Sequence, residues 1–372
     1  MKKFLNLPFF AVIASMMVFT ACSSDESIEQ PYTPEPVNLG VSVGSITVDK
    51  ALTRATATAT TAWSGTIDDT FASGDVVAIY TTDADDVWYK KSYATSAASG
   101  SAGAVTALTI GTGATDVFYW KGKSDAKKFH AYSFGNTTAI TNTAAGSGDA
   151  SDNFHFETSN KFTVTADQQT GANYEFLYSY GYIPYSTATK TIVLNHQLAR
   201  IDLELVVEKP AAALVTEKSV KIGSTTAGKG VTMAATFTPG TFSALVTAGT
   251  EDMGSGHNGS WTLSTATSDI DQVITPRVIS TEAAVTPATT PATYTTKYSA
   301  VVLPQDFNGK DMFVISYDGA TYKYTGQSTD DIQLGKKYTY KIEISADKLN
   351  VTQVSINAWT DVSKGTVTAN LQ

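Results

Sequence analysis

A few residues of this 372-residue chain have types and spacings that could support chemistry. Ser124 and Lys127 share the Ser-x-x-Lys spacing of some acyl-enzymes, in which the serine attacks a carbonyl group. That chemistry requires the serine at the start of a helix inside a cleft, whereas Ser124 falls in a polar turn between aromatic segments. We therefore interpret the spacing as coincidental.

Acidic pairs and histidines are the remaining candidates. Three acidic pairs offer oxygen atoms to a cation such as Ca²⁺: Asp85-Asp86, Asp330-Asp331 and the spaced pair Asp269/Asp271. None has the glycine and terminal glutamate of a calcium-binding loop, which indicates solvated turns. His130 and His196 have apolar neighbours, which is typical of hydrogen-bonded structural histidines. The sequence predicts no enzyme, no cofactor and no metal site, and a secreted hydrolase would lack its catalytic constellation.

The composition points to a β-rich protein with a polar, mostly uncharged surface. Hydrophobic residues make up 42% of the chain, whereas charged residues make up 16%, against about 25% in an ordinary soluble domain. Threonine, which is β-branched and favours strands, occupies 56 positions. The net charge of −9 argues against nucleic acid as a partner. Four histidines and one cysteine are too few for a Cys/His zinc cluster, and one cysteine cannot form an intrachain disulfide.

The first residues are typical of a bacterial export signal. Two lysines precede an apolar stretch over residues 4–19, which suits a signal peptide and is short for a membrane span of about 20 residues. The segment ending at Cys22 resembles a lipobox, in which cleavage between Ala21 and Cys22 leaves a diacylated N-terminal cysteine. We predict a signal peptide over residues 1–21 and a lipid on Cys22. An ordinary signal peptide with an incidental cysteine is the alternative.

A lone apolar strand follows the predicted anchor. Residues 22–36 are polar and proline-rich, a linker composition, and residues 37–48 alternate with the period of a strand. Arg54 comes next, shortly before a run of Thr and Ala at residues 56–61. Because a basic residue before a small, flexible run is accessible to proteases, the sequence predicts a cleavage site after this strand.

The rest of the chain consists of short strand patterns separated by turn residues. The strand patterns cover residues 76–80, 87–89, 117–120, 128–134, 174–185, 201–207, 300–303, 312–317 and 338–344. The segments 91–116 and 136–150 are predicted to be loops, the stretch 247–296 is predicted to be loop-rich, and one helical turn is expected at 211–217. We predict an all-β fold of two β-sandwich domains, over residues 55–190 and 191–372.

Several short motifs, in their order along nearly the whole chain, resemble the Bacteroidetes fimbrillin family. They are the lipobox, Leu52-Thr53-Arg54-Ala55, the segment from Phe71 to Tyr80, Phe129-His130-Ala131-Tyr132, the segment from Leu194 to Ile201, Val302-Leu303-Pro304 and the segment from Ile356 to Asp361. The resemblance implies two transthyretin-like β-sandwich domains. It also implies an adhesive role, in subunits that polymerise into type V pili or that anchor or tip them.

The resemblance further implies maturation by an Arg-specific protease. Residues 22–54 would then be a propeptide that includes a removable N-terminal strand. Cleavage after Arg54 would make Ala55 the new N-terminus and would release the chain from the lipid on Cys22. The lost strand would leave a groove and an unpaired sheet edge that require a partner.

The C-terminal tail, residues 366–372, is the candidate donor of that partner strand. Val367, Ala369 and Leu371 alternate with polar residues and so share one face of an extended strand. Head-to-tail insertion would give an open filament of this chain or related pilins. The tail could instead be the last strand of its own domain.

These expectations place a lipidated precursor in the outer membrane and the mature chain in an extracellular fimbrium, with a host or bacterial surface receptor as a further partner. The alternative is a surface lipoprotein that keeps Cys22. Such a protein would act as a pilus anchor, a tip adhesin or a monomeric binder of glycans or host protein.

Overall fold

Strands and the turns between them make up the described part of the molecule. The computed structural model describes residues 39–43, 76–82, 88–95, 106–110, 120, 122, 126–135, 161–169, 176–185, 190–209, 218–240, 258–282, 292–345, 348–358, 361–362 and 366–368. Residues 35–372 form one compact unit, and residues 1–34, which form another, lie outside the described ranges. Every regular element in the described ranges is a strand, which confirms the all-β prediction.

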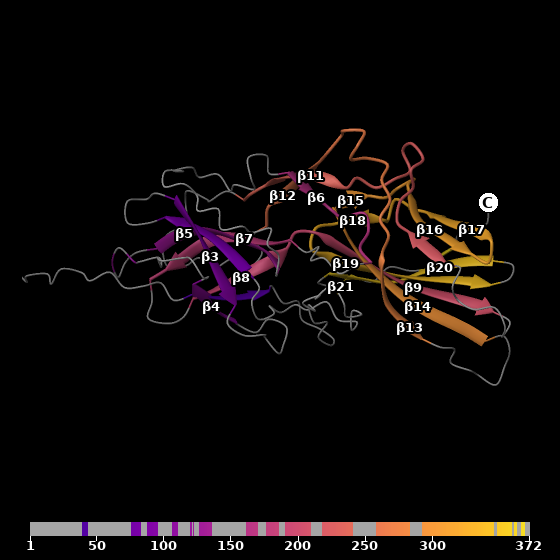
Figure 1. Ribbon diagram of the computed structural model, residues 1–372, viewed down its shortest axis with the longest axis horizontal. Coiled ribbons are helices and arrows are strands. Elements are labelled where there is room, and N and C mark those ends of the chain that lie inside the picture. The colour runs from indigo at the N-terminus through magenta and orange to yellow at the C-terminus, as the bar shows by residue number, and fades with distance from the viewer. Residues whose placement is uncertain are drawn as a thin grey trace, which may run out of the picture. The chain divides into compact units, whose positions relative to one another are not determined.

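The first group of strands closes into a ring, drawn in indigo to magenta in Figure 1. Its members are β1 (Leu39–Val43), β2 (Val76–Thr82), β3 (Trp88–Thr95), β4 (Thr106–Ile110), β5 (Ala126–Gly135), β7 (Leu177–Pro184) and β8 (Lys190–His196). They pair in the order β1-β4-β3-β2-β5-β7-β8, and β8 pairs with β1. All these pairs are antiparallel except β1–β8, which is parallel. Closure leaves no free edge in this barrel.

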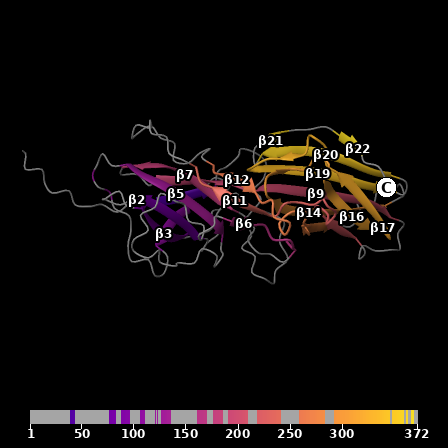
Figure 2. The same cartoon turned by 90° about the horizontal axis from the view of Figure 1, so that it is seen from above.

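A larger sheet follows along the chain. Its members are β9 (Ala199–Lys209), β13 (Arg277–Glu282), β14 (Ala292–Val302), β19 (Lys336–Ser345), β20 (Lys348–Ala358), β21 (Asp361–Val362) and β22 (Thr366–Thr368). The order is β13-β14-β9-β19-β20, and both β21 and β22 pair with the outer edge of β20. Figure 2 shows β14, β9, β19 and β20 side by side.

Three smaller sheets complete the described structure. The first pairs β10 (Ser219–Lys221), β16 (Asp311–Tyr317) and β17 (Ala320–Thr325); the second pairs β12 (Ser260–Leu263), β11 (Ala234–Thr238) and β6 (Lys161–Thr163); the third pairs β15 (Gln305–Asp306) and β18 (Asp331–Ile332). In the second sheet β6, which lies before β8 in the chain, pairs with β11, which lies after β9.

The predicted alternation over residues 201–207 and 338–344 is confirmed. In β9, Ile201, Leu203 and Leu205 are at most 2% exposed, while Asp202 and Glu204 lie closer to the surface. The core-facing residues of β19 are the equally buried Tyr338, Tyr340, Ile342 and Ile344. A fully buried aliphatic side chain stabilises the folded state by about 1.5–3 kcal/mol. The parallel pair of β9 and β19 therefore contributes strongly to the stability of the core.

The ring passes into the larger sheet through only two residues, Gln197 and Leu198. Gln197 is fully buried, and its backbone N–H donates to the carbonyl oxygen of Phe176 at 2.8 Å. Its carbonyl oxygen accepts from Nε1 of Trp261 at 2.6 Å. These bonds join the transition between the two strand groups to the residue before β7 and to β12. The transition lies near the predicted boundary at residue 190, and the division into two domains stays a prediction.

The loop predicted over 91–116 was wrong in part, and the loop-rich stretch 247–296 also contains strands. The segment 91–116 contains the end of β3 and all of β4, and the segment 247–296 contains β12, β13 and the start of β14. These strands are rich in Thr, Ser and Ala, so no apolar alternation marked them. The predicted loop 136–150, the helical turn 211–217 and the strand 117–120, apart from the buried Trp120, lie outside the described residues.

Candidate functional site

The strand β1 closes the ring by pairing in parallel with β8. The register runs from Leu39 opposite Lys190 to Val43 opposite Leu194, through five consecutive residue pairs. On its other side β1 pairs with β4 in the antiparallel direction. We call the two edges that flank β1, those of β4 and β8, the β1 seat.

The pairing with β4 is shorter. Gly40 stands opposite Ala107, and Val41 stands opposite Thr106. The strand that closes the ring is therefore held mainly by β8. Each backbone hydrogen bond of such a ladder contributes a net stabilisation of about 0.5–1.5 kcal/mol.

The β8 side of the β1 seat is apolar. Ile192 and Leu194 are fully buried, and they stand opposite Val41 and Val43 of β1. In β1 itself Ser42 is buried. Loss of β1 would expose both the backbone groups and the apolar row of β8 to water, so an empty β1 seat would bind a replacement strand.

The C-terminal strand β22 lies on the edge of β20. Thr366, Val367 and Thr368 stand opposite Thr352, Val351 and Asn350. Among the described residues of the tail, this pairing is three residues long. The tail that the sequence identified as a candidate donor thus pairs within its own sheet, as the alternative of a last strand in its own domain anticipates.

The other residues predicted to take part in processing and exchange lie outside the described ranges. They are Ala21, Cys22, Arg54, Ala55, Ala369 and Leu371. Cleavage, lipidation and donor-strand insertion therefore stay predictions. Strand β1 lies 11 residues before Arg54, since it ends at Val43 (54 − 43).

The lysine of the Ser-x-x-Lys spacing and one of the two predicted structural histidines lie in β5. Lys127 of the Ser-x-x-Lys spacing is buried, and Ser124 lies outside the described residues. His130 is buried, and its Nδ1 lies 2.7 Å from Oη of Tyr178. Because Oη of Tyr178 accepts from the backbone N–H of Gly240, its own proton can be donated to His130. The structural role predicted for His130 is confirmed, and His196 is likewise buried.

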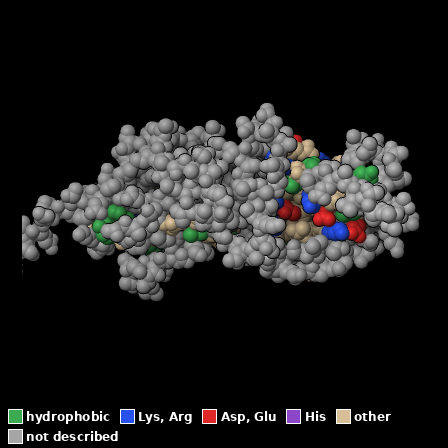
Figure 3. Space-filling view, turned by 90° about the horizontal axis from the view of Figure 1, so that it is seen from below, with side chains coloured by type: hydrophobic (Ala, Val, Ile, Leu, Met, Phe, Trp, Pro, Cys, Tyr) green, Lys and Arg blue, Asp and Glu red, His purple; other side chains and the backbone are tan. Residues whose placement is uncertain are grey.

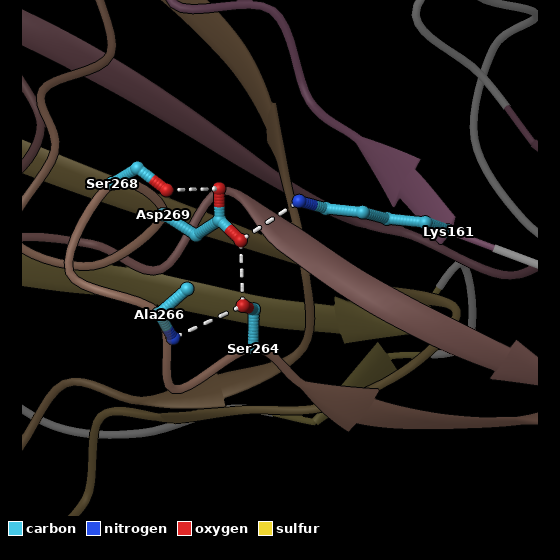
Figure 4. Close-up of polar contacts among 5 residues, drawn as sticks. All are labelled: Lys161, Ser264, Ala266, Ser268 and Asp269. Carbon is cyan, nitrogen blue, oxygen red and sulfur yellow. Dashed lines mark hydrogen bonds and ion pairs between the residues drawn. The ribbon is translucent and has the colours of Figure 1, made fainter. Parts of the chain in front are cut away.

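The carboxylate of Asp269 binds protein donors, as Figure 4 shows. Its Oδ2 accepts from Ser264 Oγ at 2.6 Å and from Lys161 Nζ at 2.9 Å, and its Oδ1 accepts from Ser268 Oγ at 3.3 Å. The hydrogen bond from Ser264, followed by that from Lys161, lowers the pKa of Asp269. Since Lys161 belongs to β6, this carboxylate also holds β6 against the turn after β12.

Asp271 occupies a nest of backbone N–H groups. Its Oδ1 accepts from the N–H of Gly230 at 3.1 Å. Hydrogen bonds from the backbone of Gly228 and then Gly230 lower the pKa of Asp271. A Cβ atom at Gly230 would lie 2.2 Å from the Cα of Asp271, so only glycine fits there. Both acids of the 269/271 pair thus bind protein groups in their turn.

The prediction of a solvated turn was wrong for Asp330. This residue is 1% exposed, and it accepts from Tyr324 Oη at 2.8 Å, from Tyr340 Oη at 2.9 Å and from the backbone N–H of Gln327 at 2.8 Å. Burial, and then the Asp330 carboxylate, raise the pKa of both tyrosines. Only the neighbouring Asp331 is exposed. Asp330 is buried because three donors converge on it from β17, β19 and the turn.

Neither a cluster of metal ligands nor a membrane-spanning helix is found in the part of the chain that the structure describes. No three His, Cys, Asp or Glu side chains there gather as ligands for a metal ion. Over the same residues no helix is long and apolar enough to cross a bilayer. The face in Figure 3 shows basic side chains beside acidic ones, and Lys297 and Lys341 flank Glu204 in the sheet register.

Sequence reasoning missed the partners of β1. It predicted the strand at residues 37–48, but it assigned β4 to a loop and did not connect the row Ile192 and Leu194 with the N-terminus. The alternation of these two residues was the available signal. It marks a buried face and carries no information on which strand lies beside it.

Comparisons with known proteins identify a family through a family model and a similar fold through a solved structure. A family model described as fimbrillin-like matches residues 53–359. No curated protein matches the chain. A candidate cell adhesion protein from Bacteroides uniformis is similar in structure, with 14% identity and a TM-score of 0.50 over 87% of this chain and 98% of that chain. This likeness supports the fold alone.

Two further solved structures are more distant. A fimbrial assembly protein from Parabacteroides distasonis has 13% identity and a TM-score of 0.42, over 88% of this chain and 96% of that chain. The fimbrial anchor protein Mfa2 from Porphyromonas gingivalis has 11% identity and a TM-score of 0.34, over 89% of this chain and all (100%) of that chain.

Proposed function

The chain belongs to the fimbrillin-like family, and from that premise we propose that it is a structural subunit of an adhesive fimbria, assembled by strand exchange after removal of β1. The observation that carries the proposal is the position of β1. It is the strand that closes the ring, and it precedes Arg54, the predicted cleavage site.

Cleavage after Arg54 would convert β1 from a tethered strand into a separate peptide. While the chain is intact, residues 44–75 tether β1 to β2, and a tether of this kind holds a segment at an effective concentration of about 1 mM. Once the tether is cut, the released strand is diluted into the medium. The backbone bonds to β8 and β4 then have to retain it alone, and a competing strand can take the β1 seat.

The incoming strand would come from the tail of another copy. In one subunit β22 is held on β20 by three residue pairs, whereas the β1 seat offers five pairs along β8 and two along β4. A tail that leaves β20 and inserts between two edges therefore gains backbone bonds. Because donor and acceptor lie at different places on the subunit, the product is an open filament.

The same cleavage would also determine where the mature chain is located. Cys22 lies upstream of Arg54, so a lipid on Cys22 would hold the precursor in the outer membrane and stay behind with the released peptide. Nothing in the proposed assembly requires catalysis by the subunit itself. The partners are other copies or related pilins, a maturation protease and, for adhesion, a surface receptor.

The test is mass spectrometry of the N-terminus of material sheared from the cell surface, for the natural chain and for Arg54→Ala. We expect a mature chain that begins at Ala55, with high-mass ladders that the variant loses. A chain that begins at acylated Cys22, without ladders in either sample, would refute strand exchange by trimming and would favour an anchor or a monomeric surface binder.

A matched pair of tail variants tests the donor separately. Val367→Lys alters the apolar row of the tail, and Thr368→Lys alters the neighbouring position on its other face. We expect the first variant to be cleaved normally and to lose the ladders, while the second keeps them. Ladders that persist in both variants would show that the donor strand lies elsewhere.

A further inference from the structure

One segment that lies within the ring in sequence pairs with strands outside the ring. Residues 161–169, which we call the arm, come between β5 and β7, two strands of the ring. The arm itself bonds to β11, to β14 and to the residues just before β13, all of which follow the ring along the chain. From this placement we infer that the arm is a clamp that makes the ring and the larger sheet unfold together.

The first half of the arm is held as a strand. All three residues of β6 pair with β11 in the antiparallel direction. Directly after β6, the N–H of the buried Val164 donates to the carbonyl oxygen of Met233 at 2.8 Å, which extends this pairing. Nζ of Lys161 donates to Asp269 at 2.9 Å (Figure 4), but its side chain is 48% exposed. Because water screens an exposed ion pair, the backbone pairing is the stronger link.

The second half of the arm takes the place of a direct pairing between β13 and β14. In the register of these strands Arg277 stands opposite Ser299, so Thr275 would stand opposite Val301 if the pairing continued. Thr275 instead exchanges two backbone hydrogen bonds with the arm, at 2.7 and 3.0 Å. The arm therefore binds the backbone groups that β14 would otherwise bind.

The Gln168 side chain joins the arm to β14 at this point. It is 1% exposed, and its Nε2 donates to the carbonyl oxygen of Val301 at 2.8 Å. Its Oε1 accepts from the N–H of the same residue at 2.9 Å. The amide thus pairs with Val301 as a residue of a neighbouring strand would. Since Val301 also stands opposite Arg200 of β9, the arm is linked to the middle of the larger sheet.

The arm returns to the ring through a short connection. Six residues separate its end from Phe176, which is fully buried and directly precedes β7. The ring centroid of Phe176 lies 5.8 Å from that of Phe162 in the arm and 5.7 Å from that of Trp261 in β12. The ring and the larger sheet are therefore linked both through the arm and through the two residues Gln197 and Leu198.

The inference rests on the proposed function for its purpose. In a filament the ring would hold the incoming strand and the larger sheet would supply the tail, so tension would pass from one strand group to the other. A link beside the two-residue crossover lets the subunit carry this tension while both groups stay folded. The coupling itself is a property of the folded chain and does not require strand exchange.

The test is urea unfolding of the purified full-length chain, with hydrogen exchange of each peptide measured by mass spectrometry. We expect peptides from β5 and β7 to lose protection at the same urea concentration as peptides from β9 and β19. In Gln168→Ala the two sets should lose protection at urea concentrations that differ by at least about 0.5 M, because the amide no longer pairs with Val301.

Gln169→Ala is the matched control. Gln169 is exposed, and it is its backbone N–H that donates to Asp167, so this variant should unfold like the natural chain. If Gln168→Ala does not fold, then Gln168→Met replaces it, because a methionine keeps most of the side-chain volume and removes the same hydrogen bonds.

Two outcomes would overturn the inference. One is a natural chain whose ring and larger sheet lose protection at different urea concentrations. The other is a Gln168 variant in which both groups still lose protection together. A natural chain that unfolds in one step but forms no high-mass ladders after cleavage would refute strand exchange and leave the clamp standing.

Discussion

Replacement of Asp330 should be one of the most destabilising single changes in the described strands. Asp330→Ala removes the acceptor for two buried hydroxyl groups, those of Tyr324 and Tyr340, and for the backbone N–H of Gln327. The tyrosines are 3% and 0% exposed, so water cannot replace the lost acceptor without opening the core. Gln327 is exposed, and its N–H can bind water instead.

The magnitude follows from these contacts. A buried donor left without an acceptor costs about 1–3 kcal/mol, so two such hydroxyls cost about 4 kcal/mol. That is a large part of the roughly 5–15 kcal/mol by which a domain is stable. The measurement is the free energy of unfolding from urea titrations of the mature chain, followed by tryptophan fluorescence.

The adjacent acid provides the control. Asp331 is exposed, and its carboxylate accepts only a long hydrogen bond from Gln333, at 3.4 Å. Asp331→Ala should therefore change the free energy of unfolding by no more than about 0.5 kcal/mol. If both alanine variants are equally stable, then Asp330 does not serve as the buried acceptor described here.

Three further predictions concern pH and packing. Burial raises the pKa of Tyr298 from 10.0 to about 12, so the contribution of its neutral side chain to stability should be fully present below pH 10 and be lost as pH rises through about 12. Unfolding midpoints that stay constant over this pH range would contradict this prediction. Hydrogen bonds, first of all the one from Ser264, lower the pKa of Asp269 below 3.8, so the contribution of its carboxylate to stability is present above pH 3.8 and is lost as pH falls further. The Asp269→Asn variant should therefore show a weaker dependence of the melting temperature on acid pH. Gly230→Ala forces a Cβ atom against the backbone of Asp271 and should cost about 1–3 kcal/mol in a urea titration, whereas natural stability would show that the turn can shift.

Much of the fold could be read from alternation alone. The apolar rows of β9 and β19 and the aromatic segments of β5 and β7 identified strands and their buried faces, because the side-chain period of a strand is two. Composition identified the fold class. The order of the short motifs pointed to the family, although each motif alone is degenerate.

The strands that the sequence missed share a composition. Strands β4 and β12 contain threonine, alanine or serine where a core strand would have larger residues, and β13 is an edge strand. Such strands are stabilised by the backbone groups of the strands beside them: β4 pairs with β3 and β1, β12 pairs with β11, and β13 pairs with β14. A local pattern has no access to them.

The sequence by itself determined that the chain is all-β, that one cysteine follows an apolar stretch, and that only three arginines are present. Only the tertiary structure decided where the strands and these side chains lie relative to one another. It placed residues 39–43 between β4 and β8, buried Asp330 among tyrosines and enclosed Arg200 in the centre of a sheet. The physical reason is that the period of a strand specifies which face is buried, while the strand beside it can lie far away in the chain, as in the pairing of Leu39 with Lys190 across 151 residues (190 − 39).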